Sequence, residues 1–257
     1  MAATMQTMHA RERALTGAAL VGITVLAWGY LLVPAPGGGM DGSMAIPGAT
    51  GWGLDMLMAS AAMWAVMMVA MMLPSASPMI LTYARVRQQR DAHGGTTVPT
   101  WVFVAGYLGV WVGFGVLAAV AQWGLHQSAL LSSAMGKVGP LLAGGLLVTA
   151  GAFQFSGLKE ACMTRCRTPL SFLMTEWRDG TYGALVMGVR HGAFCTGCCW
   201  ALMLLMFVGG IMSLAWMAAL TLYFLAEKLL PRPELVGRVT GAGLVAGGLV
   251  VGLTGYW

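Results

Sequence analysis

The sequence HGAFCTGCCW, at residues 191–200, gathers most of the side chains in this chain that could do chemistry, and it opens an apolar run. Three of the five cysteines of the chain lie here, and a histidine precedes them by one helical turn. With about 100° between successive helical residues, these four side chains fall within roughly 100° of arc and share one face. Sulfur and imidazole on one face are typical of a soft-metal site or a redox thiol pair. The four residues are His191, Cys195, Cys198 and Cys199.

The composition around this stretch is that of a polytopic membrane protein. Hydrophobic residues make up 58% of the 257 residues and charged residues only 9%, whereas soluble domains carry about 25% charged residues. The apolar runs are continuous rather than alternating, which favours transmembrane helices over a membrane β-barrel. We therefore expect an all-α fold, a bundle of about seven transmembrane helices that forms a single integral membrane domain over residues 1–257.

Seven apolar segments are long enough to be read as spans. The first follows two arginines and is longer than the apolar core of a signal peptide, so we interpret it as a retained helix. Residues 34–55 are rich in glycine and proline and are expected to form an irregular outer loop. The seven spans are about 15–33, 56–82, 101–122, 138–156, 192–208, 211–229 and 237–254.

The basic residues indicate how these spans are oriented. All of the 14 lysines and arginines except Lys137 fall at the N-terminus or in alternate loops. By the positive-inside rule, this pattern places the N-terminus in the cytoplasm of a multi-pass protein of the inner (cytoplasmic) membrane. The lipid bilayer is then the main partner. Nucleic acid is not expected as a partner, because the basic residues are scattered and have no interleaved aromatic residues.

The start of the fifth span is ambiguous, near residue 182 or near residue 192. The earlier start would bury Arg190 and His191, and a charge at the bilayer centre costs at least about 2.5–3.5 kcal/mol. We favour the start at Gly192, which leaves residues 181–191 along the inner interface.

The two remaining cysteines, Cys162 and Cys166, follow the fourth span in a basic segment and lie one helical turn apart. Both cysteine clusters are then expected on the cytoplasmic side, where structural disulfides are rare. Metal-binding thiols or a catalytic thiol pair explain them better. The candidate ligands from the two clusters are Cys162, Cys166, His191, Cys195, Cys198 and Cys199.

The second span is rich in methionine. Met67 and Met71 lie four residues apart and stack on one helix face, so we add them to the candidate metal ligands. Thioethers beside thiolates shift the preference of a site toward Cu(I) over Zn(II). Pro74 and Pro78 are expected to kink the inner half of this span, which a membrane helix tolerates where neighbours satisfy the freed carbonyls.

Three motifs resemble those of the DUF2182 family of predicted metal-binding integral membrane proteins. They are WAVMMVAMMLP at residues 64–74, FQFSGLK at residues 153–159 with the cysteines that follow it, and the segment 188–203 around HG and CTGCCWALM. The similar region covers about residues 50–235. The resemblance implies a metal site in a membrane protein, but it implies no reaction and no transported species.

The role that we expect is the handling or transport of Cu(I) or a similar thiophilic ion. Met40 and Met44 of the outer loop could capture Cu(I) at the surface, but we favour the interpretation of this segment as a plain disordered loop. One alternative is a membrane thiol–disulfide oxidoreductase that uses Cys195 and Cys198, since their spacing is that of a CxxC pair. Another is an assembly factor that delivers metal to a partner. Hydrolase and nucleotide-binding motifs are absent from the sequence, so we lean against an enzyme.

Other features bear on partners. A metal donor or acceptor protein is the expected protein partner. Glycine pairs such as Gly109 with Gly113 and Gly248 with Gly252 let helices approach closely in lipid, and an oligomer through these faces is compatible with the sequence.

We interpret Glu227 and Lys228, at the inner end of the sixth span, as an interface pair or as groups near the site.

Overall fold

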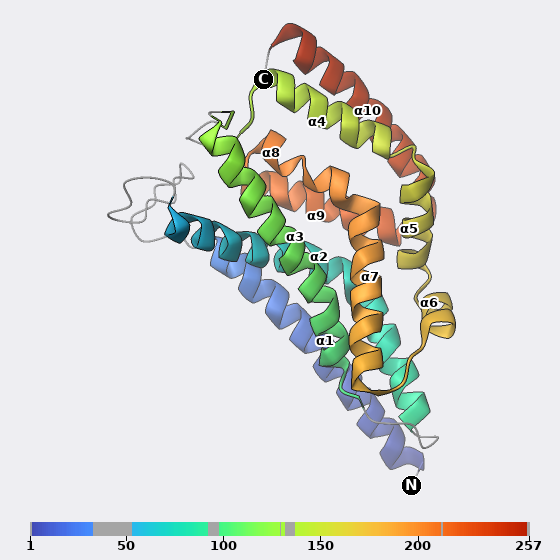
Figure 1. The fold of residues 1–257 in the computed structure, drawn as a ribbon. Coiled ribbons are helices and arrows are strands. Elements are labelled where there is room, and N and C mark those ends of the chain that lie inside the picture. The colour runs from blue at the N-terminus through green and yellow to red at the C-terminus, as the bar shows by residue number, and fades with distance from the viewer. Residues whose placement is uncertain are drawn as a thin grey trace.

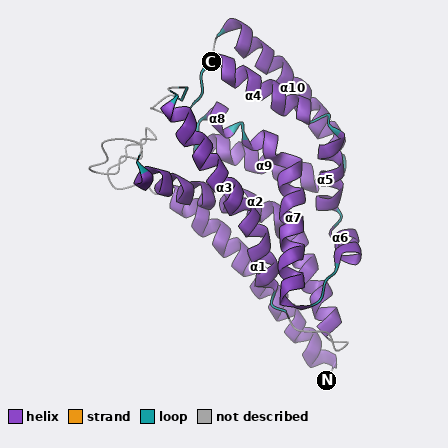
Figure 2. Cartoon of the chain, in the orientation of Figure 1, coloured by secondary structure: helices purple, strands orange, loops and turns teal. Residues whose placement is uncertain are grey.

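The computed structural model describes residues 2–32, 53–91, 98–128, 130–131, 137–211 and 213–255. These residues are all-helical, apart from an isolated bridge between Leu131 and Val138 (Figures 1 and 2). The expected all-α class is therefore confirmed, whereas Met40 and Met44 lie outside the described residues. The helices are α1 (Ala2–Leu32), α2 (Leu54–Asp91), α3 (Thr100–Gln127), α4 (Pro140–Phe153), α5 (Gly157–Arg167), α6 (Pro169–Glu176), α7 (Gly180–Met203), α8 (Met206–Gly209), α9 (Leu214–Leu229) and α10 (Pro233–Thr254).

Several of the described helices are compatible with a membrane protein. Five segments are long and apolar enough to cross a bilayer: Arg11–Leu32, α2, α3, α7 continued through α8, and α10. Helices α4 and α5 meet at a bend of 64° and would make a sixth span if they cross as one. Helix α9 has 16 residues, which is short of the roughly 17–25 that a span needs. The count of seven spans and the cytoplasmic N-terminus stay predictions.

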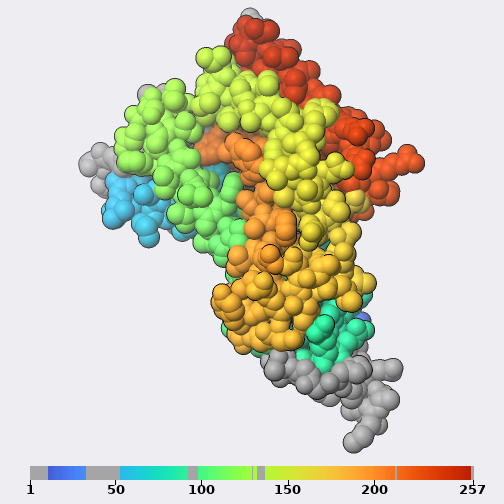
Figure 3. Space-filling view, turned by 45° about the vertical axis from the view of Figure 1, so that its right-hand side comes forward, coloured from blue at the N-terminus to red at the C-terminus, as the bar shows by residue number. Residues whose placement is uncertain are grey.

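The helices form a bundle, and α4 and α10 form an arm at one end of it (Figure 1). Helix α3 packs against both α2 and α7, and α1 packs against α2 (Figure 1). Helix α5 lies along α7, while α10 runs beside α4 at one end of the molecule (Figure 3). The bend between α4 and α5 therefore joins the arm to the helix that carries the first pair of cysteines.

Helix α2 continues without a break through Pro74 and Pro78. Proline lacks the N–H that would bond the carbonyl four residues earlier, so Pro74 frees the carbonyl of Ala70. The indole nitrogen of Trp28 in α1 donates to that oxygen at 3.1 Å. A neighbouring helix thus supplies the missing donor, as the sequence analysis required of a proline inside a membrane helix.

Helix α7 begins at Gly180, so residues 181–191 belong to the same continuous helix as the cysteines. Where this helix enters the bilayer, near residue 182 or near residue 192, stays a prediction. Arg190 remains 44% exposed and pairs with Glu176 of α6. His191 is buried among aromatic rings, where a neutral imidazole carries no charge.

Helices α3 and α7 touch backbone to backbone. A Cβ atom on Gly188 would lie 2.1 Å from the carbonyl oxygen of Phe103, and one on Gly106 would lie 2.4 Å from that of Leu185. Only glycine leaves room for contacts this close. The approach holds Tyr107 of α3 against the cysteine face of α7.

The arm is held together by glycines in the same way. A Cβ atom on Gly144 of α4 would lie 2.7 Å from the carbonyl oxygen of Gly248 in α10, so this position serves the close approach that its spacing predicts. Gly109 and Gly113 meet no described atom within 4 Å. An oligomer through such open faces stays a prediction.

Candidate metal centre

The two cysteine clusters lie on adjacent helices. Cys162 and Cys166 come from α5, and the other three come from α7, against which α5 packs. All five thiols are free and buried. The structure thus brings together the residues that the sequence placed at the inner ends of two successive spans.

The cysteines of the two helices are buried in one apolar cluster, which includes Cys166, Cys195 and Cys198. Cys162 fills the space left by Gly197, where an added Cβ atom would lie 2.7 Å from the Cys162 sulfur. The glycine of the CTGCC motif therefore has a packing role, because it lets the α5 thiol lie against α7.

Within α7, the later thiols point back toward the preceding turn. The Sγ atoms of Cys198 and Cys199 lie 3.0 and 2.9 Å from the backbone carbonyl of Cys195, to which both thiols donate. A metal ion binds the thiolate, so either sulfur would exchange this hydrogen bond for a bond to the ion.

Cys195 is the best-connected of the five. Its sulfur lies 3.3 Å from the hydroxyl of Tyr107 and 3.1 Å from the ammonium of Lys228 in α9. The same ammonium donates to the hydroxyl of Ser75 in α2 at 2.9 Å, and the Tyr107 hydroxyl donates to the carbonyl of Met72 at 3.1 Å. Side chains from four helices therefore meet around one sulfur atom, and an ammonium beside a sulfur stabilises negative charge on it.

His191 lies one helical turn before Cys195 and is 2% exposed. The rings of Tyr107, Phe103 and Phe172 lie 5.5, 6.1 and 5.7 Å from its imidazole, centroid to centroid. Its Nδ1 atom has no hydrogen-bond partner in the part of the chain that the structure describes. A buried ring nitrogen without a partner is chemically suited to a ligand role, although it does not establish one.

The methionines of α2 belong to the core. Met67 and Met71 are 1% and 0% exposed, and they pack in the same apolar cluster as the cysteines. Met72, one residue further on, is the methionine whose carbonyl accepts from Tyr107. The thioethers and the thiols therefore belong to the same core, and the role of Met67 and Met71 as ligands stays a prediction.

The donor set fits a soft ion, but its geometry is not that of a closed metal site. Among the described residues, no group of three or more His, Cys, Asp and Glu side chains is already spaced to hold a metal. The thiols of Cys198 and Cys199 donate to the backbone, and the sulfur of Cys195 contacts Tyr107 and Lys228. Binding would therefore need side-chain rotations, which are small changes for a residue with one side-chain torsion.

Tyr107 is not among the residues that the sequence singles out, and Lys228 was interpreted as part of an interface pair or as a group near the site. Both come from helices far along the chain from the cysteine motif, and no local spacing marks them. A lysine at the end of an apolar run is usually an interface anchor. One feature of the sequence pointed to separate roles for Glu227 and Lys228. Lys228 follows Glu227 directly, so the two side chains cannot share a helix face.

Comparison with known proteins bears on the metal. Residues 61–251, which include every cysteine and both α2 methionines of the candidate site, match the family model described as PpoB2, copper chaperone. No curated protein and no solved structure matches the chain significantly. The expectation of a metal-related family is confirmed, and the DUF2182 label stays a prediction.

Proposed function

The chain belongs to the PpoB2 copper chaperone family, and we propose that it is a membrane protein that binds Cu(I) at the thiols between α5 and α7 and delivers it to a partner protein. The observation that carries this proposal is that α5, with Cys162 and Cys166, packs against the cysteine face of α7, where the sulfur of Cys162 lies against Gly197. These thiols come from two separate helices, and a soft ion bound between them would join the helices directly.

The donors favour Cu(I) over Zn(II). Thiolate and thioether sulfur are the ligands that Cu(I) prefers, and a methionine-rich stretch of α2 packs in the same cluster as the thiols. Structural zinc is held by four ligands in a tetrahedral arrangement, and these residues show no such cage. An incomplete set of ligands suits a site that must release its ion, because fewer metal–ligand bonds have to break.

Lys228 would balance the charge of the site. Several thiolates around one monovalent ion leave excess negative charge in an apolar interior, which is costly unless it is paired. The ammonium 3.1 Å from Cys195 supplies that pairing. It would also stabilise the thiolate after the ion has left, so that the empty site remains ready to bind.

Delivery is favoured over thiol–disulfide exchange. The sulfur atoms of Cys195 and Cys198 belong to residues that are 0% exposed, whereas exchange requires that a partner thiolate reaches one of them. We therefore propose a non-enzymatic role, with a metal donor or acceptor protein as partner. In the predicted orientation, the α5 end of the site faces the cytoplasm.

The test is an anaerobic Cu(I) titration of the detergent-purified protein against a chromophoric chelator. Wild type should bind near-stoichiometric Cu(I), and Cys166→Ser, Cys195→Ser and Cys198→Ser should each lose most of it. Met163→Leu is the matched control, because Met163 lies between the α5 cysteines and lines a different cavity. Each variant is first checked for a wild-type unfolding transition.

Two outcomes would overturn the proposal. One is undiminished Cu(I) binding by all three serine variants, which would place the ion elsewhere. The other is a metal-free wild type in which thiol labelling shows a reducible disulfide between Cys195 and Cys198, which would favour the redox alternative. A parallel Zn(II) titration decides between the two ions.

A further inference from the structure

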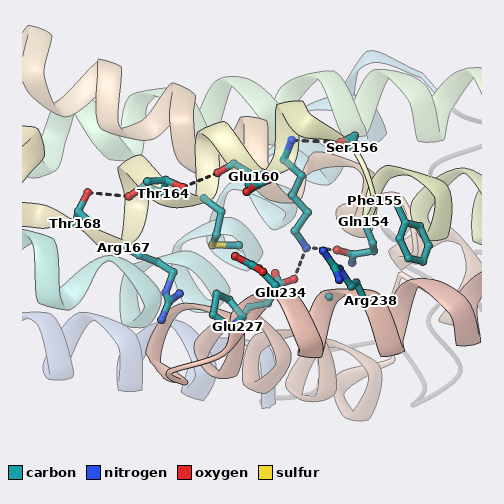
Figure 4. Close-up of a pocket in the computed structure, with 14 residues that line it drawn as sticks. Gln154, Phe155, Ser156, Glu160, Thr164, Arg167, Thr168, Glu227, Glu234 and Arg238 are labelled. Atoms are coloured by element: carbon teal, nitrogen blue, oxygen red, sulfur yellow. Dashed lines mark hydrogen bonds and ion pairs between the residues drawn. The ribbon is translucent and has the colours of Figure 1, made fainter.

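A cavity of about 420 Å³ opens between α5, α9 and α10 (Figure 4). Its described lining includes none of the cysteines, so it is distinct from the thiol site on the opposite side of α5. We propose that this cavity binds the headgroup of a zwitterionic phospholipid with a primary ammonium group, of the phosphatidylethanolamine type.

The first argument is a buried carboxylate oxygen without a partner. Glu227 is 1% exposed and lines the cavity. Its Oε1 atom accepts from the hydroxyl of Tyr223 at 2.8 Å and pairs with the ammonium of Lys159, which also donates to Gln154. Its Oε2 atom is buried and has no hydrogen-bond partner among the described residues. A rotation of the carboxyl group would turn this oxygen toward the cavity, where a primary ammonium has the N–H donors to satisfy it.

The second argument is the balance of charge. Three basic and three acidic side chains line the cavity, so that its formal charge is zero. A neutral lining that carries both signs suits a zwitterion better than an anionic headgroup, which would meet the carboxylates. The six residues are Lys159, Arg167, Arg238, Glu160, Glu227 and Glu234.

The third argument is that the two signs are arranged for two separate groups. Glu227 of α9 is buried in the lining of the cavity, whereas Arg238 of α10 is exposed and is drawn beside Gln154 (Figure 4). A phosphate at Arg238 and an ammonium at Glu227 would each meet the opposite charge. Arginine is well suited to phosphate because its planar group donates two parallel hydrogen bonds.

The fourth argument distinguishes a lipid from a small soluble zwitterion. Large apolar side chains next to the cavity are exposed in the isolated protein: Phe155 is 56% exposed, Leu158 60% and Leu235 57%. Acyl chains attached to a headgroup in the cavity could lie over these side chains. The neighbouring basic residues are also typical of a helix end at headgroup depth.

The test uses native mass spectrometry of the full-length, delipidated protein with added short-chain phospholipids. Wild type should retain phosphatidylethanolamine about tenfold better than phosphatidylcholine, whose methylated amine has no N–H to give Glu227. Arg238→Gln should lower retention about tenfold, because it removes a charge-assisted contact from an exposed side chain. Arg232→Gln is the matched control, since Arg232 is exposed in the same chain segment but does not line the cavity.

Several results would overturn the proposal. Equal retention of the two zwitterionic lipids would remove the role of Glu227, and tighter binding of phosphatidylglycerol would contradict the charge argument. Equal binding of soluble phosphoethanolamine would indicate a small metabolite instead of a lipid. An unchanged Arg238→Gln variant would place the lipid elsewhere. Cu(I) binding is titrated separately, so these results are independent of the copper proposal.

Discussion

The Nζ atom of Lys228 lies 3.1 Å from the Sγ atom of Cys195, inside the helix bundle. The hydroxyl of Ser75 holds the same ammonium from the other side at 2.9 Å. A buried ammonium is costly unless it is paired, and the nearest group that can become its counter-ion is the sulfur of Cys195. The relationship therefore ties the charge state of the candidate metal ligand to a lysine on a different helix.

The first prediction concerns the charge of Lys228. Without copper at neutral pH, wild type should show the ultraviolet absorbance of a thiolate, because the ammonium stabilises negative charge on Cys195. Lys228→Met should lose most of this absorbance, and Lys228→Arg should keep it because the positive charge remains. Anaerobic absorbance spectra, with Cys195→Ser as the blank, make the comparison. Equal thiolate absorbance in wild type and Lys228→Met would show that the contact does not ionise the thiol.

The second prediction concerns the hydroxyl of Tyr107, which lies between the Met72 carbonyl and the Cys195 sulfur. Tyr107→Phe removes one net hydrogen bond, so the free energy of unfolding should fall by about 1 kcal/mol. Tyr83→Phe is the control, since Tyr83 is equally buried and stacks on Phe103. Denaturant titration in detergent gives both values. A loss in the control as large as that in Tyr107→Phe would contradict a specific role for the hydroxyl.

The sequence predicted part of the candidate site. The convergence of both cysteine clusters follows from charge, because basic loops place the end of the fourth span and the start of the fifth on one side. In the structure, the helices that carry the two clusters, α5 and α7, pack against each other. The groups that surround Cys195 could not be predicted, because Tyr107 and Lys228 approach through the packing of three helices, and no pattern within one helix encodes such packing.

The partner of Arg190 could not be predicted either, for a physical reason. In a single apolar segment, Arg190 would bear the full cost of a position in lipid. In the structure, Glu176 of the short helix α6 pairs with it at the rim of the bundle, and that helix was not foreseen. A partner supplied by a neighbouring element removes a cost that a single apolar segment cannot avoid.

The third prediction concerns Gly188 at the contact of α3 with α7. Gly188→Ala would place a Cβ atom 2.1 Å from a backbone oxygen, so the two helices must separate and the protein should lose about 1–3 kcal/mol of stability. Gly109→Ala, on the open side of α3, is the matched control and should be nearly neutral. The sequence had selected Gly109 by its four-residue spacing. Comparable melting temperatures for the two variants would contradict the packing of α3 on α7.

The last prediction concerns the buried pair of Lys159 with Glu227, whose side chains are 6% and 1% exposed. Lys159→Met leaves a buried carboxylate without its counter-charge and should cost about 3–5 kcal/mol. Adding Glu227→Gln removes that charge, so the double variant should be more stable than Lys159→Met alone. Arg165→Met breaks a pair with Glu176 in which the arginine is 48% exposed, and it should cost at most about 1 kcal/mol. Unfolding free energies of wild type, Lys159→Met, Glu227→Gln and the double variant measure the coupling, and strict additivity would show that the two charges do not interact.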